Sequence, residues 1–392
     1  MTNDRVAIVG VGYSTTGRRT GLSSRQLAVQ AGKAALEDAG MTPADVDGVT
    51  LSWDVAGPEP EGLEPVNSDD AAHMLGIDPL HVSSSGGGIV FAHPAREAIA
   101  AVRSGQCHTA IAFRVINQRL SVPDLMSQEA PESELVPDHW TDPQFARPFG
   151  QVLPVQWPGA LTAQRHMDLY GTTEEQFGTH VINQRHNASL NPEAILRDPM
   201  TLDDYFASRY ISKPLRLFDC DYPVDSGSAV IFTTEERARD FRQKPVFVDA
   251  AAFALSWKPR TAGPESMVFT WNSPGATAEH LWKQTDLRPG DVDTVQFYDG
   301  FTIWPMMWLE ALGFCGPGES GPLIQSGATR LGGSIPLNTD GGACNMGRRH
   351  GANFCIEAVR QLRGQCGDRQ VPDAKVALWT NAYYWACLLT AD

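Results

Sequence analysis

Two distant stretches of the sequence repeat one another, and this repeat limits the possible folds more than any other feature. Residues 42–49 read TPADVDGV and residues 288–295 read RPGDVDTV, and each leads into a short apolar segment. In the same order, residues 96–112 and 356–378 each read as a helix, then Gly-Gln-Cys, then an apolar strand. Two matches in the same order favour duplication of one α/β unit over chance similarity between two connectors.

The predicted unit begins with a strand followed by a helix. Residues 5–10 (RVAIVG) are rich in β-branched side chains, which are typical of strands. Residues 24–39 carry helix-forming side chains and precede Gly40, a usual helix C-cap. With the boundary between the copies placed near residues 234–244, we predict an N-terminal half over residues 1–240 and a C-terminal half over residues 241–392.

The first half contains a long excursion over about residues 117–240. Residues 117–158 are rich in Pro, Asp, Glu and Gln, which predicts irregular structure that serves as a lid or as a dimer contact. Residues 160–245 return to helical patterns, with Thr172-Thr173-Glu174-Glu175 as a helix start. The sequence FDCDYPVDSGSAVIF then predicts a turn that enters a strand.

Composition excludes several classes of function. The formal charge of −15, from 46 acidic and 31 basic residues, argues against a nucleic-acid or anionic-membrane partner. The first residues lack the pattern of a signal peptide, and no apolar run is long enough to span a membrane. Seven scattered cysteines without a CxxC pair suit a reducing cytoplasm. The ten histidines form no HxH, HExxH or HxxxH pattern, so we expect no metal site.

Two glycine-rich segments precede the copied helices, and they are candidate anion-binding sites. Residues 83–88 read SSSGGG and residues 338–342 read NTDGG. Such turns present backbone N–H groups and the positive end of a helix dipole to a phosphate, a carboxylate or a developing enolate. Neither segment is a Walker loop or a GxGxxG fingerprint, and tight packing alone is the alternative. The candidate binding residues are Ser84, Ser85, Gly86, Gly87, Gly88, Gly341 and Gly342.

A second group of candidate residues follows the second copied connector. Tyr298 and Asp299 come at the end of a predicted strand, where functional groups of α/β sheets commonly lie. Arg348, Arg349 and His350 stand at the start of a predicted helix, where cations oppose the helix dipole. Recognition of a substrate phosphate or thioester would explain these cations, and a solvated basic turn is the alternative.

Motifs along almost the whole chain resemble the thiolase superfamily, particularly its sterol-carrier-protein type and the bacterial steroid side-chain-cleaving aldolases. The motifs are RVAIVGVGYSTTGR, SSSGGG, IAFRVIN, DCDYPVDSGSAVIF, YDGFT with WLEALGFCGPGE, and NTDGGACNMGRRHGANFCIEAVRQLRGQCGDRQV. The resemblance implies an α/β thiolase fold, with duplicated βαβαβαββ halves in a five-layer αβαβα arrangement. It also implies a homodimer.

Departures from the thiolase pattern bear on the chemistry. Thiolases place a nucleophilic cysteine before the first copied helix, where this chain has Ser83-Ser84-Ser85. Tyr298 stands where the sterol-carrier type has the histidine of its HDCF-like motif, and Arg348 matches the GHP-like histidine, with His350 two residues later. The late thiolase cysteine has no counterpart in residues 379–384, WTNAYY. We therefore do not expect Claisen chemistry through an acyl-cysteine.

The aldolase resemblance implies retro-aldol cleavage of a β-hydroxyacyl-CoA to a ketone and a shorter acyl-CoA, such as propionyl-CoA or acetyl-CoA. It implies an OB-fold, zinc-ribbon partner protein, so that any zinc would belong to the partner and this chain would need no cofactor. Such a reaction needs a base, an acid and a stabiliser of the thioester enolate. We expect Tyr298 to be acid or base, with Arg348 lowering its pKa from about 10.

His350 is the second proton-transfer candidate, and the sequence leaves open which of it and Tyr298 is the base. Asp299 is expected to orient Tyr298 or His350, and backbone N–H groups of the glycine-rich segments are expected to hold the thioester oxygen. Two alternatives stay open: a CoA-dependent thiolase that uses Cys344, and a non-catalytic subunit that binds acyl-CoA or lipid. A steroid ring is implied only by the resemblance, and another bulky ring fits the composition equally well.

Overall fold

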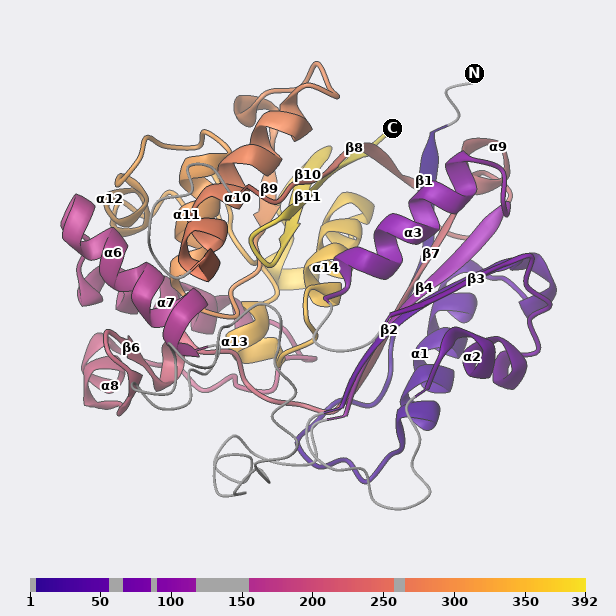
Figure 1. Ribbon diagram of the computed structural model, residues 1–392, viewed down its shortest axis with the longest axis horizontal. Helices are drawn as coiled ribbons and strands as arrows, with labels where there is room; N and C mark the ends of the chain where they lie inside the picture. Colours follow the sequence, from indigo (N-terminus) through magenta and orange to yellow (C-terminus); the bar gives the residue numbers. More distant parts are fainter. Residues whose placement is uncertain (1–4, 56–65, 86–89, 118–154, 257–264) are drawn as a thin grey trace.

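The computed structural model describes residues 5–55, 66–85, 90–117, 155–256 and 265–392 (Figure 1). Within these residues, nine strands form one mixed sheet in the order β3-β2-β4-β7-β1-β8-β11-β10-β9. The first half contributes β1 (Val6–Tyr13), β2 (Gly48–Val55), β3 (His81–Ser85), β4 (Thr109–Asn117) and β7 (Ser226–Thr234). The second half contributes β8 (Val246–Phe253), β9 (Thr294–Gln296), β10 (Val376–Asn381) and β11 (Trp385–Ala391).

The strand order repeats about the centre of the sheet. Read inward from each edge, β2-β4-β7-β1 of the first half corresponds to β9-β10-β11-β8 of the second. The halves meet where β1 and β8 pair in antiparallel fashion. Beside β9, Leu337 forms a parallel bridge with Val295, in the position that β3 holds beside β2. The predicted duplicated α/β fold is therefore confirmed.

Helices cover the sheet on both faces and lie between its halves (Figure 1). α1 (Ser24–Ala39) and α2 (Ser68–Leu75) cover the outer face of the first half-sheet, and α10 (Glu265–Trp282) packs on β8 and β11. α3 (Ala92–Arg103) and α14 (Ala352–Arg363) form the central layer, because α14 contacts β7 and β1 as well as β9, β10 and β11. These layers match the predicted five-layer αβαβα arrangement.

Alternation along β1 explains how one strand serves two cores. Val6 and Ile8 belong to the core that contains α3 and α14, whereas Ala7 and Val9 belong to the core under α1 and α2. Successive side chains of a strand point to opposite faces, so this apolar run buries both faces of the sheet. α1 ends at Gly40 with φ 70°, as the sequence predicts, and it starts at the N-cap Ser23.

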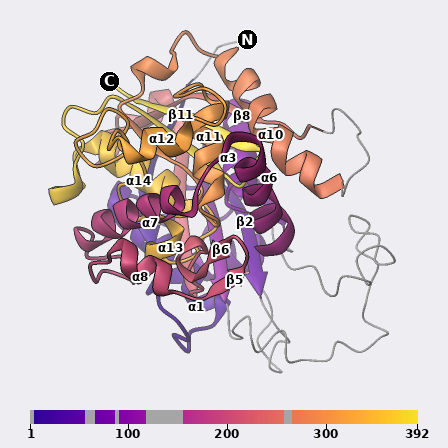
Figure 2. The same ribbon diagram turned by 90° about the vertical axis from the view of Figure 1, so that its left-hand side faces the viewer.

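The excursion of the first half places helices beside the second half (Figure 2). α7 (Glu174–Ser189) packs on α12 (Ser320–Gln325) and α13 (Gly342–Met346), so it lies over the second glycine-rich segment. The predicted lid or dimer contact falls mainly on residues 118–154, which lie outside the described residues. The excursion contains the π-helix η3 (Val155–Ala160), α6 (Leu161–Tyr170), α7 (Glu174–Ser189), α8 (Leu202–Ala207), β5 (Tyr210–Ser212), β6 (Leu215–Arg216) and the short helix η4 (Leu217–Asp219).

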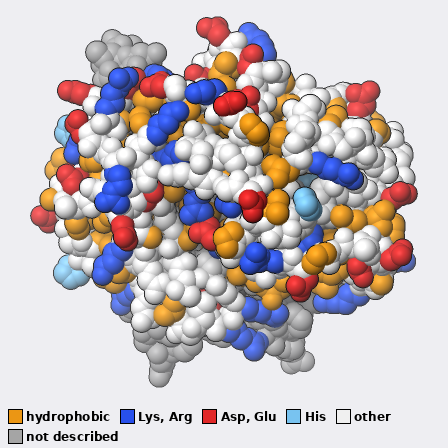
Figure 3. All heavy atoms as spheres, turned by 180° about the vertical axis from the view of Figure 1, so that it is seen from behind, with side chains coloured by type: hydrophobic (Ala, Val, Ile, Leu, Met, Phe, Trp, Pro, Cys, Tyr) orange, Lys and Arg blue, Asp and Glu red, His pale blue; other side chains and the backbone are white. Residues whose placement is uncertain are grey.

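Short helices complete the described part of the chain. The duplicated connectors form matching 3-10 turns, η1 (Pro43–Asp45) and η5 (Pro289–Asp291). The others are α9 (Glu235–Ala238), α11 (Ile303–Ala311), α12 (Ser320–Gln325), α13 (Gly342–Met346) and η6 (Gly367–Arg369). Among the described helices, none combines the length and the apolarity needed to cross a membrane. On the face seen in Figure 3, basic and acidic side chains are interspersed.

Candidate active site

Tyr298 lies just after β9 and is held on three sides. Its ring stacks on Trp304 of α11, with centroids 5.3 Å apart, and meets the edge of Phe354 of α14 at 5.8 Å. Its backbone N–H donates to the Thr380 hydroxyl in β10 at 3.1 Å. Gly300 leaves room for the phenol, since a Cβ there would lie 3.0 Å from the Tyr298 hydroxyl. The phenol is thus fixed beside the start of α14.

Burial keeps the Tyr298 phenol protonated. Burial raises its pKa well above the usual value, and the nearby Asp221 carboxylate adds to the rise. Arg348 lowers this pKa, in the direction that the sequence analysis expects, but burial outweighs it. The prediction that Arg348 makes Tyr298 more acidic than a free phenol is therefore wrong in its net effect.

Arg348 forms an ion pair with Asp221, a residue that the sequence analysis did not single out. Arg348 Nε lies 3.8 Å from Asp221 Oδ1. The Asp221 N–H donates to the Gly300 carbonyl at 3.2 Å, and the Arg348 N–H donates to the Tyr222 carbonyl at 2.7 Å. Burial raises the pKa of Asp221 to about 6, although Arg348 opposes this rise. The carboxylates of the DCDYPVDSG motif were the signal that could have identified Asp221.

His350 lies on the same loop and contacts the first half of the protein. Its backbone has φ 47°, and its carbonyl accepts a hydrogen bond from the Phe91 N–H at 2.9 Å. Arg114 of β4 donates to His350 Nδ1. Burial lowers the pKa of His350 well below the usual value, and Arg114 and Arg348 lower it further. A buried arginine in the apolar run IAFRVIN was a signal that sequence reasoning missed.

Asp299 anchors α13, and it acts on Tyr298 only through its charge. Its Oδ1 accepts a hydrogen bond from the Ala343 N–H at 2.7 Å. The Gln184 amide, oriented to satisfy its neighbours, donates to Asp299 Oδ2 at 2.9 Å. In the described part of the chain Asp299 makes no hydrogen bond to Tyr298 or His350, which corrects the expected orienting role.

The second glycine-rich segment uses its N–H groups within the fold. The Gly341 N–H donates to the Asn338 carbonyl at 3.0 Å, and the Gly342 N–H donates to Asp340 Oδ1 at 2.7 Å. Both N–H groups are therefore occupied, and the expectation that they hold a thioester oxygen is wrong for this conformation. Gly342 is needed for space, because a Cβ there would lie 2.0 Å from Asp299 Oδ2.

The first glycine-rich segment begins as strand and not as loop. Ser83, Ser84 and Ser85 belong to β3 at the edge of the sheet, which corrects their assignment to a loop. Ser84 Oγ accepts a hydrogen bond from the Ser68 N–H at 2.8 Å, at the start of α2. Gly86, Gly87 and Gly88 lie outside the described residues, so their anion-binding role stays a prediction.

Cys344 is poorly placed to act as a thiolate. Its Sγ donates to the Asp299 carbonyl at 3.3 Å. Burial raises its pKa well above the usual value, and the Asp299 and Asp221 carboxylates raise it further. A reactive cysteine needs a cationic neighbour or a helix N-terminus that stabilises its thiolate, and these carboxylates have the opposite effect.

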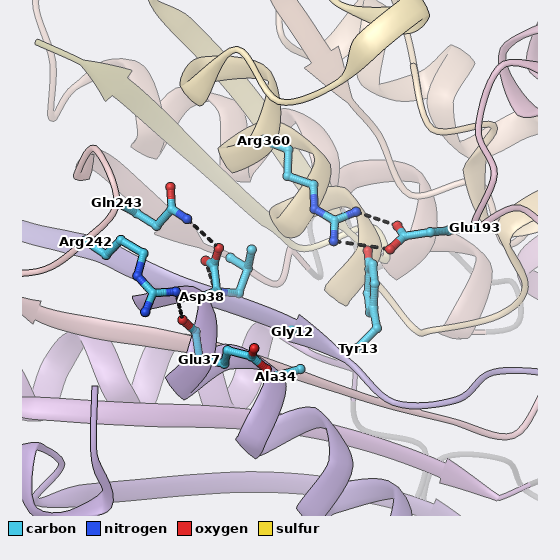
Figure 4. A pocket seen from close by; sticks show the side chains of 10 residues that line it. Gly12, Tyr13, Ala34, Glu37, Asp38, Glu193, Arg242, Gln243 and Arg360 are labelled. Carbon is cyan, nitrogen blue, oxygen red and sulfur yellow. Dashed lines mark hydrogen bonds and ion pairs between the residues drawn. The ribbon is translucent and has the colours of Figure 1, made fainter. Parts of the chain in front are cut away.

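A cavity of about 370 Å³ lies elsewhere, over β1 and α1 (Figure 4). Tyr298, Arg348 and His350 do not line it. Several of its lining residues bond one another: Arg360 pairs with Glu193, the Gln243 amide donates to Asp38 at 2.9 Å, and Arg242 donates to the Glu37 carbonyl at 2.8 Å. This internal pairing makes the cavity a polar structural cleft, and it leaves the Tyr298 neighbourhood as the candidate active site.

Comparison with known proteins agrees with this fold. Residues 264–383 match a family model described as "Thiolase C-terminal domain-like". The chain is 35% identical over 377 residues to the 17-hydroxy-3-oxo-4-pregnene-20-carboxyl-CoA lyase of Mycobacterium tuberculosis, and the match covers 93% of each protein. It is 34% identical over 397 residues to a steroid side-chain-cleaving aldolase of Thermomonospora curvata, with 98% of each covered.

A solved structure shares nearly the whole fold. The structure described as an "Ltp2-ChsH2(DUF35) aldolase" superposes with a TM-score of 0.85 at 30% sequence identity, and the match covers 99% of this chain and 98% of that chain. Sequence identity of 30–35% over nearly the whole length of these proteins indicates common ancestry and not only a shared fold. The chain therefore belongs to the thiolase superfamily, within the sterol-carrier-protein-type group that includes the steroid side-chain-cleaving aldolases.

Proposed function

We propose that the protein is a carbon–carbon lyase that cleaves a β-hydroxyacyl-CoA side chain, carried on a steroid or another bulky ring, to a ketone and a shorter acyl-CoA. The observation that carries the proposal is the buried, neutral Tyr298 beside the Asp221–Arg348 pair, in a thiolase-like frame with serines at the nucleophile position. Similarity to proteins named as a CoA lyase and as an aldolase supports it.

The two titratable groups suit the two proton transfers. With a pKa of about 6, the Asp221 carboxylate is ionised at neutral pH and accepts the β-hydroxyl proton. The carbon–carbon bond then breaks, the ketone forms, and the electron pair enters the thioester enolate. Tyr298 gives its proton to the α-carbon, and the proton on Asp221 returns to the phenolate. Arg348 is only partly buried, and its 3.8 Å ion pair leaves the guanidinium able to contact the substrate.

The assembly is also a proposal. One solved relative is described as a complex with ChsH2(DUF35), and we propose that this chain likewise works with an OB-fold, zinc-ribbon partner and as a homodimer. A retro-aldol step moves protons and breaks one carbon–carbon bond, so the chain needs no cofactor of its own, and any zinc belongs to the partner. All seven cysteines are free, which supports a cytoplasmic location.

The product assay tests this function. The purified chain with its co-purifying partner is incubated with a steroid β-hydroxyacyl-CoA, and the ketone and the shorter acyl-CoA are measured by liquid chromatography with mass spectrometry. Tyr298→Phe removes the acid and is expected to lower kcat by about 10²- to 10⁴-fold. Tyr210→Phe, which alters a tyrosine bonded to Glu174 in the excursion, is the matched control. Full activity of Tyr298→Phe would contradict the assignment.

The same assay separates the alternatives. Cys344→Ser is expected to keep its activity, because the Cys344 thiol lies among carboxylates. A cleavage that requires free CoA and is lost in Cys344→Ser would instead identify a thiolase. Tight acyl-CoA binding without turnover, in the presence of every candidate partner, would identify a non-catalytic subunit.

A further inference from the structure

Asn381, the last residue of β10, carries an amide nitrogen that is not used within the fold. The residue is fully buried, at 0% exposure. Its Oδ1 accepts a hydrogen bond from the Ala92 N–H, at the start of α3, at 2.7 Å. Because a backbone N–H can only donate, this bond fixes the orientation of the amide and turns Nδ2 away from Ala92. Nδ2 makes no hydrogen bond to the part of the chain that the structure describes.

The start of α14 shows which way this nitrogen points. A Cβ added to Gly351, the residue before α14, would overlap Nδ2 and Cγ of Asn381, so the amide packs directly on the Gly351 backbone. Tyr298 meets Phe354, three residues further along the same turn, with ring centroids 5.8 Å apart. Residues three apart are neighbours on the surface of a helix. The unused donor and the proposed acid therefore face the same turn of α14.

The sheet also holds Asn381 beside Tyr298. β9 and β10 run parallel with Gln296 opposite Trp379, so Tyr298 and Asn381 each come two residues later at the same end of the sheet. The Tyr298 N–H donates to the hydroxyl of Thr380, the residue before Asn381, at 3.1 Å. The phenol and the amide are thus carried by neighbouring segments at the carboxyl ends of two parallel strands.

The proposed reaction needs a hydrogen-bond donor of this kind. Negative charge develops on the thioester oxygen as the enolate forms, and preorganised donors stabilise it. The N–H groups of Gly341 and Gly342 are occupied within the fold, so they do not supply such a donor. A buried N–H group without a partner costs free energy, which a bond to the substrate offsets.

We propose that Asn381 is a catalytic residue, whose Nδ2–H group donates a hydrogen bond to the thioester oxygen and stabilises the enolate. The bond between Oδ1 and the Ala92 N–H keeps the amide in the donating orientation. Tyr298 then protonates the α-carbon of the same enolate. The inference rests on the proposed retro-aldol function and adds to it the group that stabilises the negative charge.

Asn381→Asp separates the donor from the contact with α3. The carboxylate keeps an acceptor for the Ala92 N–H in nearly the same shape but has no hydrogen to donate. We expect kcat to fall by about 10²- to 10³-fold in the product assay, while circular dichroism shows an unchanged fold. Asn381→Ala, which adds no charge, should lose a similar factor and so exclude repulsion by the new carboxylate as the cause.

Asn67→Asp is the matched control. The Asn67 side chain also accepts an N–H at a helix start, that of Asp70 at 2.8 Å, but it is exposed and lies before α2. We expect its kcat to equal that of the unchanged protein. If folded Asn381→Asp and Asn381→Ala both kept kcat within about threefold, the donor role would be overturned even though the product assay confirms cleavage.

Ligand binding tests the same hydrogen bond without turnover. Propionyl-CoA has a thioester oxygen, whereas S-propyl-CoA is the thioether in which two hydrogens replace that oxygen. For the protein with its co-purifying partner, we expect calorimetry to show about three- to tenfold tighter binding of propionyl-CoA, the usual net effect of one hydrogen bond. Asn381→Ala should bind the two ligands equally. A preference that persists in Asn381→Ala, or no preference in the unchanged protein, would contradict the proposal.

The two measurements distinguish failure of this inference from failure of the proposed function. Cleavage at the full rate in the Asn381 variants would overturn the donor and leave the lyase function standing. No cleavage by the unchanged protein, together with a preference for propionyl-CoA that Asn381→Ala abolishes, would contradict the lyase function and keep Asn381 as a thioester-binding residue.

Discussion

Tyr298 and Asp221 respond to the same burial with opposite chemical consequences. Burial favours the neutral form of each, so the phenol stays an acid at every physiological pH. Asp221 keeps Arg348 beside it, and its pKa of about 6 leaves a carboxylate at neutral pH. Environments that push two groups to different protonation states are a usual way to provide an acid and a base in one site.

Loss of the Asp221 carboxylate is therefore expected to impair the reaction. Asp221→Asn keeps the shape and removes the base, which should lower kcat by about 10²- to 10⁴-fold in the product assay. Asp240→Asn, at an exposed position after α9, is the matched control and should not change kcat. Unimpaired turnover in Asp221→Asn would show that another group accepts the proton.

The pH profile provides a separate prediction about Asp221. Because its pKa is raised to about 6, its active carboxylate form disappears as the pH falls through 6. We expect kcat/KM to decline about tenfold per pH unit below that value, and the residual activity of Asp221→Asn to lack this limb. A flat profile of the unchanged protein between pH 5 and 7 would be inconsistent with a base at Asp221.

Gly342 shows why a glycine-rich motif need not bind a ligand. Gly342→Ala places a methyl group 2.0 Å from Asp299 Oδ2 at φ 69°, and we expect it to cost about 2–4 kcal/mol of unfolding free energy. Gly364 also has a positive φ, 72°, but a Cβ there would have no other atom within 4 Å. We therefore expect Gly364→Ala to lower the free energy of unfolding by about 1 kcal/mol, from backbone strain alone. Urea unfolding measures both, and equal costs would mean that space at Gly342 is not limiting.

At the scale of elements, the two aspartates that the duplicated connectors share each accept backbone hydrogen bonds that fix the connection. In each copy the first aspartate of DVD accepts a hydrogen bond from the backbone N–H of the residue that precedes the 3-10 turn. Thr42 donates to Asp45 and Arg288 donates to Asp291, both at 2.8 Å. The second aspartate accepts two N–H groups at the start of the following inner strand. The repeat in the sequence is therefore a repeat of one connection between β2 and β4, and between β9 and β10.

Removal of the second aspartate should loosen that connection. Asp293→Ala leaves the N–H groups of Lys375 and Val376 without their carboxylate acceptor, and we expect a loss of about 1–3 kcal/mol in the free energy of unfolding. Asp286→Ala, at an exposed position of the same region, should stay within about 0.5 kcal/mol. Chemical denaturation measures the free energy of unfolding of both variants. Equal values for Asp293→Ala and Asp286→Ala would contradict the role of the connector.

At the scale of the whole molecule, the site draws on both halves. Tyr298, Arg348 and His350 come from the second half, whereas Arg114 and Asp221 come from the first. α14 lies between the half-sheets and contacts strands of each. Duplication thus provides the two half-sheets, and their packing on the central helices brings the candidate catalytic residues together.

The halves are accordingly not expected to be independent. A fragment of residues 241–392 would expose the face of α14 that packs on β7 and β1. A small domain that buries too little surface has only marginal stability. We expect this fragment to be largely unfolded alone and to gain structure when co-expressed with residues 1–240. Circular dichroism and dispersion of amide resonances measure this, and a folded isolated fragment would contradict it.

The sequence by itself determined what depends on neighbours along the chain. Strand and helix patterns, the C-cap of α1, the duplicated connectors and the position of Tyr298 after β9 follow from local periodicity, hydrogen bonding and repeat, and these features were predictable. The family resemblance extended this to the layers of the fold. It also directed attention to Tyr298, Arg348 and His350 as neighbours.

Only the tertiary structure decided which groups face one another. The pairing of Arg348 with Asp221 and of Arg114 with His350 joins segments far apart in the chain, and no local pattern encodes such contacts. The tertiary structure also assigned the Gly341 and Gly342 N–H groups to the fold and Asp299 to α13. The physical reason is that pKa values and hydrogen-bond partners depend on burial and on charges in space, which the packing of the two halves establishes.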